Sequence, residues 1–275
     1  MPRLTSIMRS TELLNYYRNL SQGLLTVVDV ETTGRYAWSD RITEISVLQA
    51  TLADGIQQQR TDLVNPQTRI PLKIVQFTGI TQAMVEAAPA GEEVFPNYLP
   101  LLNQGVLTAH NVAFDYPFLQ TEYARLGIQF ARSESEQLCT VQLARLMLPD
   151  LRSRSLPELV KYFQFPVGTS HRAEADTLAC WLLAKTLLLE LLETADPILL
   201  ARFARQRIPL KLAAQLLNCS QVQARSRLEA AGVATKFVGQ GRSGTWMYRR
   251  GDVEQLAEQA GSCEPANQSS NFSVK

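Results

Sequence analysis

The chain has 275 residues, enough for one α/β domain of ordinary size and a second, smaller module. Its 45% hydrophobic and 19% charged residues exclude a fibrous or disordered protein. The net charge of +1 hides an acidic body and a basic appendage, because residues 201–250 carry ten Lys or Arg and one acid. This division predicts a body that binds cations and an appendage that binds phosphates.

The N-terminal region and the cysteines indicate the cellular compartment of the protein. The first twenty residues contain no apolar stretch long enough for a signal peptide or a membrane span. The four cysteines are far apart and form no C-x-x-C pair, so neither a zinc ribbon nor a disulfide framework is indicated. We therefore expect a cytoplasmic protein with reduced thiols and no membrane partner.

The first half of the chain alternates between strand and helix patterns. Residues 26–30 are apolar and β-branched apart from one acid, which predicts a buried strand, and residues 41–52 and 58–64 predict a hairpin. Helical patterns follow at residues 79–103, where Thr81 is an expected N-cap. A short strand is predicted at 106–109 and a helix at 114–126, closed by Gly127.

The second half predicts helices at residues 156–163 and 173–192, of which the longer is apolar on several faces and belongs in a core. Asp196-Pro197 ends this unit, and the composition then becomes basic. We predict four segments: an N-terminal extension at 1–21, an α/β domain at 22–195, a basic module at 196–260, and a disordered tail at 261–275.

Two carboxylates are predicted to converge at the end of the first strand. Asp29 and Glu31 are two residues apart, so their side chains project from the same face. Such a pair also arises by chance, and surface charges on an edge strand are an equally simple interpretation. The apolar run at residues 24–28 instead favours a central strand, where unpaired charges are costly.

Two further segments carry acids next to the two histidines of the chain. His110-Asn111 precedes a helix with Asp115 in its first turn, although Asn111 could be an N-cap and Asp115 an ordinary helix-start acid. His171 precedes the long helix, and Asp176 follows among apolar neighbours. A lone histidine is more often structural than catalytic, but both histidines fall inside these segments.

Taken together, these segments resemble the DnaQ-like exonucleases, the branch of the DEDD superfamily with a histidine in the last motif. The resemblance covers about residues 22–195. It rests on D-V-E-T-T-G at 29–34, H-N-V-A-F-D-Y-P-F-L at 110–119 and H-R-A-E-A-D at 171–176, with F-T-G-I-T at 77–81 before the second motif. The family includes the proofreading epsilon subunit of bacterial DNA polymerase III, so a DNA polymerase is one candidate partner.

The resemblance implies an α/β, ribonuclease-H-like mixed sheet flanked by helices and a 3′→5′ exonuclease that releases nucleoside 5′-monophosphates. It implies that His171 is the general base. The residues expected to be catalytic and to hold two Mg²⁺ or Mn²⁺ ions through oxygen ligands are Asp29, Glu31, Asp115 and Asp176. The residues expected to lie near the terminal nucleotide are Thr32, Thr33, His110 and Asn111.

The basic module resembles a helix-turn-helix with a wing. Helices are predicted at 210–217 and 221–231 around Asn218-Cys219-Ser220, followed by a hairpin of residues 233–238 and 245–249. Candidate phosphate contacts are Arg225, Arg227, Lys236, Arg242, Arg249 and Arg250. A solvated face on a protein-docking module is the alternative.

Two classes of function stay open from the sequence. The first is an active exonuclease for single-stranded 3′ ends, for which we expect DNA in replication or repair and keep RNA trimming as the alternative. The second is a catalytically idle nucleic-acid-binding protein. The complete carboxylate set favours activity, because four converging acids without a metal are electrostatically unfavourable.

Overall fold

The computed structural model describes residues 8–168, 171–239 and 244–261. It divides the chain into two compact units, one of Glu12–Leu199 and one of Met1–Thr11 together with Leu200–Lys275. The predicted tail lies outside the described residues from residue 262 onward. The two units are described separately below.

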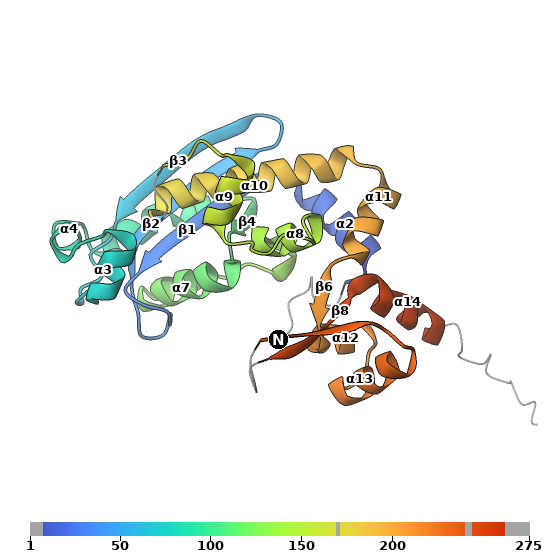
Figure 1. Cartoon of the computed structure of the whole chain (residues 1–275). Coiled ribbons are helices and arrows are strands. Elements are labelled where there is room, and N and C mark those ends of the chain that lie inside the picture. The colour runs from blue at the N-terminus through green and yellow to red at the C-terminus, as the bar shows by residue number, and fades with distance from the viewer. Residues whose placement is uncertain (1–7, 169–170, 240–243, 262–275) are drawn as a thin grey trace, which may run out of the picture. The chain divides into compact units, whose positions relative to one another are not determined.

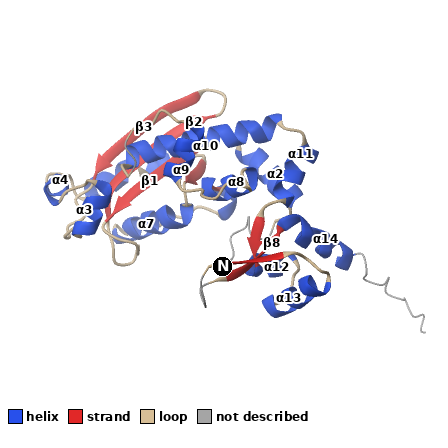
Figure 2. Cartoon of the chain, in the orientation of Figure 1, coloured by secondary structure: helices blue, strands red, loops and turns tan. Residues whose placement is uncertain are grey.

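A mixed five-stranded sheet forms the centre of the larger unit, in the order β3-β2-β1-β4-β5. Figure 2 shows its strands β1, β2 and β3 in red. The central strand β1 is antiparallel to β2 and parallel to β4, and β5 is parallel to β4. The strands are β1 (Leu25–Thr32), β2 (Ile42–Thr51), β3 (Gly55–Leu63), β4 (Val106–Ala109) and β5 (Gln137–Cys139). This sheet, flanked by helices, confirms the predicted α/β class.

β1 is buried on both faces, which explains its nearly continuous apolar sequence. Leu25, Val27 and Val28 are fully buried, as are Ile45 and Leu48 of β2. A strand that is covered by other elements on both faces of the sheet can carry apolar side chains both above and below it. The acids at the end of this strand are therefore exceptions that need an explanation.

Helices cover the sheet, and the long helix α10 (Ala173–Glu193) packs against β1 and β2 (Figure 1). Its apolar side chains are buried because they face these strands and the helix α8. The other helical elements with residues in this unit are α2 (Ser10–Leu20), α3 (Leu72–Thr78), α4 (Gln82–Glu86), α5 (Gly91–Val94), η1 (Phe95–Asn97), α6 (Leu99–Leu102), α7 (Val112–Arg125), η2 (Glu134–Glu136), α8 (Thr140–Met147), α9 (Leu156–Phe163) and α11 (Asp196–Ala204). The predicted N-cap Thr81 accepts a hydrogen bond from the backbone N–H of Met84 at the start of α4.

The smaller unit contains a three-stranded antiparallel sheet in the order β6-β8-β7. Asn218 adopts a left-handed conformation with φ 49°, and the Ser220 hydroxyl accepts a hydrogen bond from Gln223 N, so the turn between α12 and α13 forms as predicted. The elements are β6 (Arg207–Pro209), α12 (Leu210–Leu216), α13 (Gln221–Ala230), β7 (Thr235–Val238), β8 (Thr245–Arg249) and α14 (Arg250–Gly261). None of the helices that the structure describes is both long enough and apolar enough to span a membrane.

Candidate metal centre

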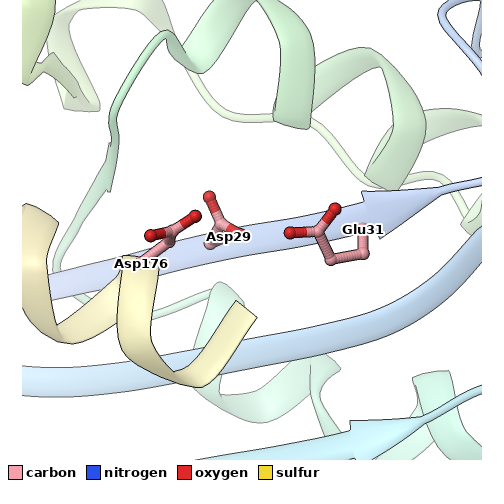
Figure 3. A group of neighbouring side chains, drawn as sticks. All are labelled: Asp29, Glu31 and Asp176. Carbon is pink, nitrogen blue, oxygen red and sulfur yellow. The ribbon is translucent and has the colours of Figure 1, made fainter. Parts of the chain in front are cut away.

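Three carboxylates converge where the end of β1 meets the start of α10. Asp29 and Glu31 come from β1 and Asp176 from the first turn of α10, and one oxygen of each lies within 4.8 Å of the others. Figure 3 shows the side chains of Asp29 and Asp176 next to each other, with Glu31 further along the strand. The structure thus brings together residues that are far apart in the sequence.

The local structure explains this convergence. Residues two apart on a strand project from one face, which places Asp29 and Glu31 together. α10 packs on β1, and its N-terminal turn carries Asp176 to the same place. The backbone N–H of His171 donates to Asp176 Oδ2 at 3.0 Å, which fixes the carboxylate against the segment that precedes the helix.

Asp115, the fourth predicted carboxylate, lies in the first turn of α7 beside this group. Its Oδ1 accepts a hydrogen bond from the backbone N–H of Val30 at 3.3 Å, between the two acids of β1. Its side chain is buried. It is close enough to Asp29 to raise the pKa of that carboxyl, second only to burial.

Burial and mutual repulsion raise the pKa values of this acidic cluster. Burial raises the pKa of Glu31 from 4.5 to about 8, and the carboxylates of Asp176 and Glu44 add to it. Burial also raises the pKa of Asp115 from 3.8 to about 7. The pKa of Asp29 lies well above its ordinary value for the same reasons. Without a cation, burial and mutual repulsion therefore favour the protonated forms of these groups.

Glu44 is a further acid at this site that the sequence did not single out. It lies on β2 directly opposite Glu31 and is 1% exposed. Its oxygens accept hydrogen bonds from Arg172 Nη2 at 2.5 Å and from the backbone N–H of Ala173 at 2.8 Å. Because Ala173 is the first residue of α10, this pairing ties the helix that carries Asp176 to β2. The feature of the sequence that could have indicated Glu44 is an acid inside a buried strand, β2 (Ile42–Thr51).

His171 lies on the segment that enters α10, in a left-handed conformation with φ 67°. Its ring packs on Phe77 with the ring centroids 3.9 Å apart. Phe77 belongs to the F-T-G-I-T segment, so the structure brings this connecting segment to the histidine. A left-handed backbone is costly for a residue with a side chain, and it persists only where the surrounding contacts hold it.

His110, which the sequence predicts to bind substrate, is held by contacts within the protein. Its Nε2 donates to the Arg154 carbonyl at 2.9 Å, and its Nδ1 lies 2.9 Å from the hydroxyl oxygen of Thr140. Burial lowers the pKa of His110 to about 4. Both ring nitrogens are thus engaged within the protein, and the neutral ring joins α8 to the loop before α9.

The remaining predicted substrate-binding residues shape the turns around the cluster. The Thr32 hydroxyl donates to the Gly34 carbonyl at 2.6 Å, and the Thr33 hydroxyl accepts from the backbone N–H of Arg41 at 3.0 Å. Asn111 is exposed and adopts a left-handed conformation with φ 85° just before α7, without a side-chain capping bond. Thr32 and Thr33 thus hold the loop at the carboxyl end of β1.

The side chains predicted to contact phosphate in the smaller unit differ in their exposure and in their partners within the protein. Arg250 is 2% exposed, and its guanidinium donates to Gln206, Glu254 and the Met8 carbonyl, so the prediction that it contacts phosphate is wrong. Arg225 pairs with Glu229 on α13, whereas Lys236 and Arg249 are exposed. Arg242 lies outside the described residues.

The acidic cluster fits a hard divalent cation. Its donors are all carboxylate oxygens, which Mg²⁺ and Mn²⁺ prefer, and sulfur or imidazole ligands are not part of it. A bound cation would also relieve the repulsion that raises the pKa values of Asp29, Glu31 and Asp115. The residues present therefore suit a divalent metal centre.

Comparison with known proteins places this arrangement in a family context. A model of the family described as "Exonuclease" matches residues 26–183. The DNA polymerase III PolC-type of Clostridium perfringens is 36% identical over 154 residues, 56% of this chain and 10% of that protein. The DNA polymerase III subunit epsilon of Aquifex aeolicus is 33% identical over 169 residues, 61% of this chain and 81% of that protein. The chain thus spans about a tenth of the PolC-type relative and most of the epsilon subunit.

A solved structure supports the same fold. Exonuclease I of E. coli, in complex with a dT13 oligonucleotide, superposes with a TM-score of 0.56 at 19% sequence identity. The match covers 66% of this chain and 43% of exonuclease I. At this identity the likeness concerns the fold of the larger unit.

Proposed function

This chain belongs to the exonuclease family, and on that premise we propose that it is a metal-dependent 3′→5′ exonuclease that releases nucleoside 5′-monophosphates from DNA. The convergence of Asp29, Glu31 and Asp176 supports this proposal most directly. Keeping these acids together in a buried place is unfavourable unless a cation binds them. A metal-dependent reaction explains why these acids converge, whereas nucleic-acid binding without catalysis does not.

We assign the ligands of two Mg²⁺ or Mn²⁺ ions to Asp29, Glu31, Asp115 and Asp176. When bound, the two ions would stabilise the charge that develops on the attacking and leaving oxygens at phosphorus. Glu44 and Arg172 would hold Asp176 in place through the N-terminus of α10. The carboxylates must be deprotonated to bind, so their raised pKa values make metal binding depend on pH.

We propose His171 as the general base. It would accept at a ring nitrogen the proton of the water that attacks phosphorus, while the bond from phosphorus to the 3′ oxygen breaks and that oxygen takes a proton from solvent. The ring stacks on Phe77 in the resting protein, so it would turn from this stack toward the acidic cluster when substrate binds.

We propose that residues 22–195 carry hydrolysis and that residues 196–260 form a winged-helix-like module that binds nucleic acid. DNA is the expected substrate, because the relatives are named as DNA polymerases and a DNA polymerase subunit. These names also make a DNA polymerase the partner to test first.

Degradation of a labelled oligonucleotide tests the proposed function. A single-stranded 20-mer with a 5′ label should give a ladder that shortens from the 3′ end in Mg²⁺, and EDTA should stop it. Asp29→Asn should abolish the ladder, while Asp54→Asn, in an exposed turn, should not. Release of a labelled mononucleotide from the 5′ end first would contradict the polarity, and degradation in EDTA would contradict the metal dependence. The same assay on a matched RNA separates the two substrates.

A further inference from the structure

The three-stranded sheet of the smaller unit has one face in the core and one face open. Ile208 and Tyr248 are paired across β6 and β8 and are buried among the helices of this unit. Because side chains alternate along a strand, the neighbouring positions point away from this core. We call this the open sheet face, and its basic residues are Arg207, Lys236 and Arg249.

Two arginines stand directly opposite each other on this face. Arg207 of β6 pairs with Arg249 of β8 in the antiparallel register, and both side chains are exposed. Lys236 of β7 pairs with Met247, which lies two positions from Arg249 on the same face, so a third positive charge stands diagonally across the strand. Like charges placed directly opposite on neighbouring strands destabilise a sheet. Such an arrangement is favourable once an anion bridges the charges.

Internal partners do not neutralise these charges. Within the described residues, Arg207, Lys236 and Arg249 make no side-chain hydrogen bond and no ion pair. Two other arginines of this unit do have partners within the protein. Arg225 pairs with Glu229 and lies over the ring of Trp246, and Arg250 is buried among internal acceptors. The open sheet face is therefore a distinct set of unpaired cations.

The surrounding sequence favours a polyanion over a single acidic group. Residues 201–250 contain ten Lys or Arg and one acid, so the potential around the sheet is positive over many residues. The three charges are spread over three adjacent strands. Strands lie about 4.8 Å apart, so these charges span the spacing of successive phosphates rather than one carboxylate.

We propose that the open sheet face binds the phosphate backbone of single-stranded DNA through Arg207, Arg249 and Lys236. This inference rests on the proposed function, because it takes the nucleic acid to be the substrate of the exonuclease. It keeps Lys236 and Arg249 from the contacts predicted from the sequence, leaves out those on α13, and adds Arg207. Arginine suits this role because its planar guanidinium donates two parallel hydrogen bonds to phosphate.

Salt-dependent binding by the full-length chain tests the proposal. Fluorescence anisotropy of labelled dT20 in EDTA measures affinity without cleavage, at salt concentrations from 50 mM to 1 M. Each lost phosphate contact lowers the slope of log affinity against log salt by about 0.7 for a single strand. Arg207→Ser with Arg249→Ser should therefore lower the slope by about 1.4 and weaken binding at 50 mM salt by about 10- to 100-fold.

Two matched variants separate charge from shape and location. Arg207→Lys with Arg249→Lys keeps both charges and should retain most of the slope. Arg225→Ser removes an exposed arginine from α13 and should change the slope little. An unchanged slope in the double Ser variant would overturn the proposal and favour a protein-docking surface. A fall in the slope of about 0.7 in Arg225→Ser, the same loss per charge as in the double Ser variant, would also overturn it. Binding would then follow the total charge of the unit.

The same experiment distinguishes this inference from the proposed function. Hydrolysis of a dT3 trinucleotide by the wild-type chain in Mg²⁺ reports on the metal centre alone. No hydrolysis with normal dT20 binding would contradict the exonuclease and leave the open sheet face supported. Normal hydrolysis with an unchanged salt slope in the double Ser variant would contradict only the open sheet face. Thermal unfolding checks that the double Ser variant is folded, and removing a like-charge pair should not lower its midpoint.

Discussion

Replacing Glu31 by Gln should change how the stability of the metal-free protein depends on pH. Burial and the Asp176 carboxylate raise the pKa of Glu31 from 4.5 to about 8 in the folded protein. A group whose pKa is raised on folding contributes stability that is fully present below its unfolded pKa, here 4.5, and is lost as the pH rises toward 8. Metal-free wild-type protein should therefore become less stable between pH 5 and 8.

The size of this effect follows from linkage. Between the two pKa values the folded state holds one proton more than the unfolded state, so the free energy of unfolding falls by about 1.4 kcal/mol per pH unit. Over the two units from pH 5.5 to 7.5 the share of Glu31 is about 2 to 3 kcal/mol. Gln cannot ionise, so Glu31→Gln should lose stability less steeply by that amount. Asp115, with its pKa raised to about 7, should keep part of the slope in the variant.

Urea unfolding in EDTA measures the slope in the larger unit. Trp181 of α10 is buried and serves as the reporter when Trp38 and Trp246 are replaced by Phe. Glu92→Gln is the matched control, because Glu92 is exposed on α5. The reasoning is refuted if Glu31→Gln shows the wild-type slope, or if metal-free wild-type protein gains stability between pH 5.5 and 7.5.

Three further predictions concern the same site. His171→Ala should lose about 10²- to 10⁴-fold in kcat while its Mn²⁺ affinity, measured by titration, stays near the wild-type value; a parallel loss of Mn²⁺ affinity would make the histidine a ligand. Glu44→Gln, which leaves Arg172 with a neutral partner, should weaken Mn²⁺ binding by about tenfold as Asp176 loses its fixed position, and equal affinity in the variant would refute that role. Mg²⁺ binding at pH 7 should release about one proton or more, since Glu31 is then mostly protonated and Asp115 about half protonated; calorimetry in two buffers of different ionisation enthalpy counts these protons, and buffer-independent heats would count against the raised pKa values.

Elements with strong local signals could be predicted from the sequence. The apolar run before Asp29 and Glu31 predicted β1, and the helical pattern predicted α9 with its bounds at Leu156–Phe163. The turn at Asn218 and Ser220 formed as predicted because both residue types act locally, through left-handed backbone and capping. These signals need no information about distant parts of the chain.

Elements held by distant contacts could not be predicted in this way. β5 has three residues and exists because it pairs with β4, and residues 140–147 continue from it as α8. The region 1–21 was predicted only as an extension, yet α2 forms there, and the Tyr16 hydroxyl donates to the Gln137 carbonyl at 2.5 Å. The surface against which α2 packs could not be read from its own sequence.

Burial and internal contacts of the predicted site residues could not be read from the sequence. A motif gives the residue type, whereas the role of a side chain depends on what surrounds it. His110 belongs to a motif, but both of its ring nitrogens form hydrogen bonds within the protein, with Thr140 and Arg154. Arg250 is buried, although the sequence around it is basic. Glu44 was missed because a single acid within an apolar strand gives no sign of its partner Arg172, 128 residues away.

A change of metal preference at Asp176 tests the central claim most directly. Cys in place of a carboxylate ligand offers a soft thiolate, which binds Mg²⁺ poorly and thiophilic ions better. Asp176→Cys should therefore be inactive in Mg²⁺ and recover part of its activity in Cd²⁺, while Asp54→Cys, in an exposed turn, should behave as the wild type in every ion. Wild-type activity of Asp176→Cys in Mg²⁺, or wild-type hydrolysis that persists in EDTA, would contradict a metal-dependent exonuclease built on this acidic cluster.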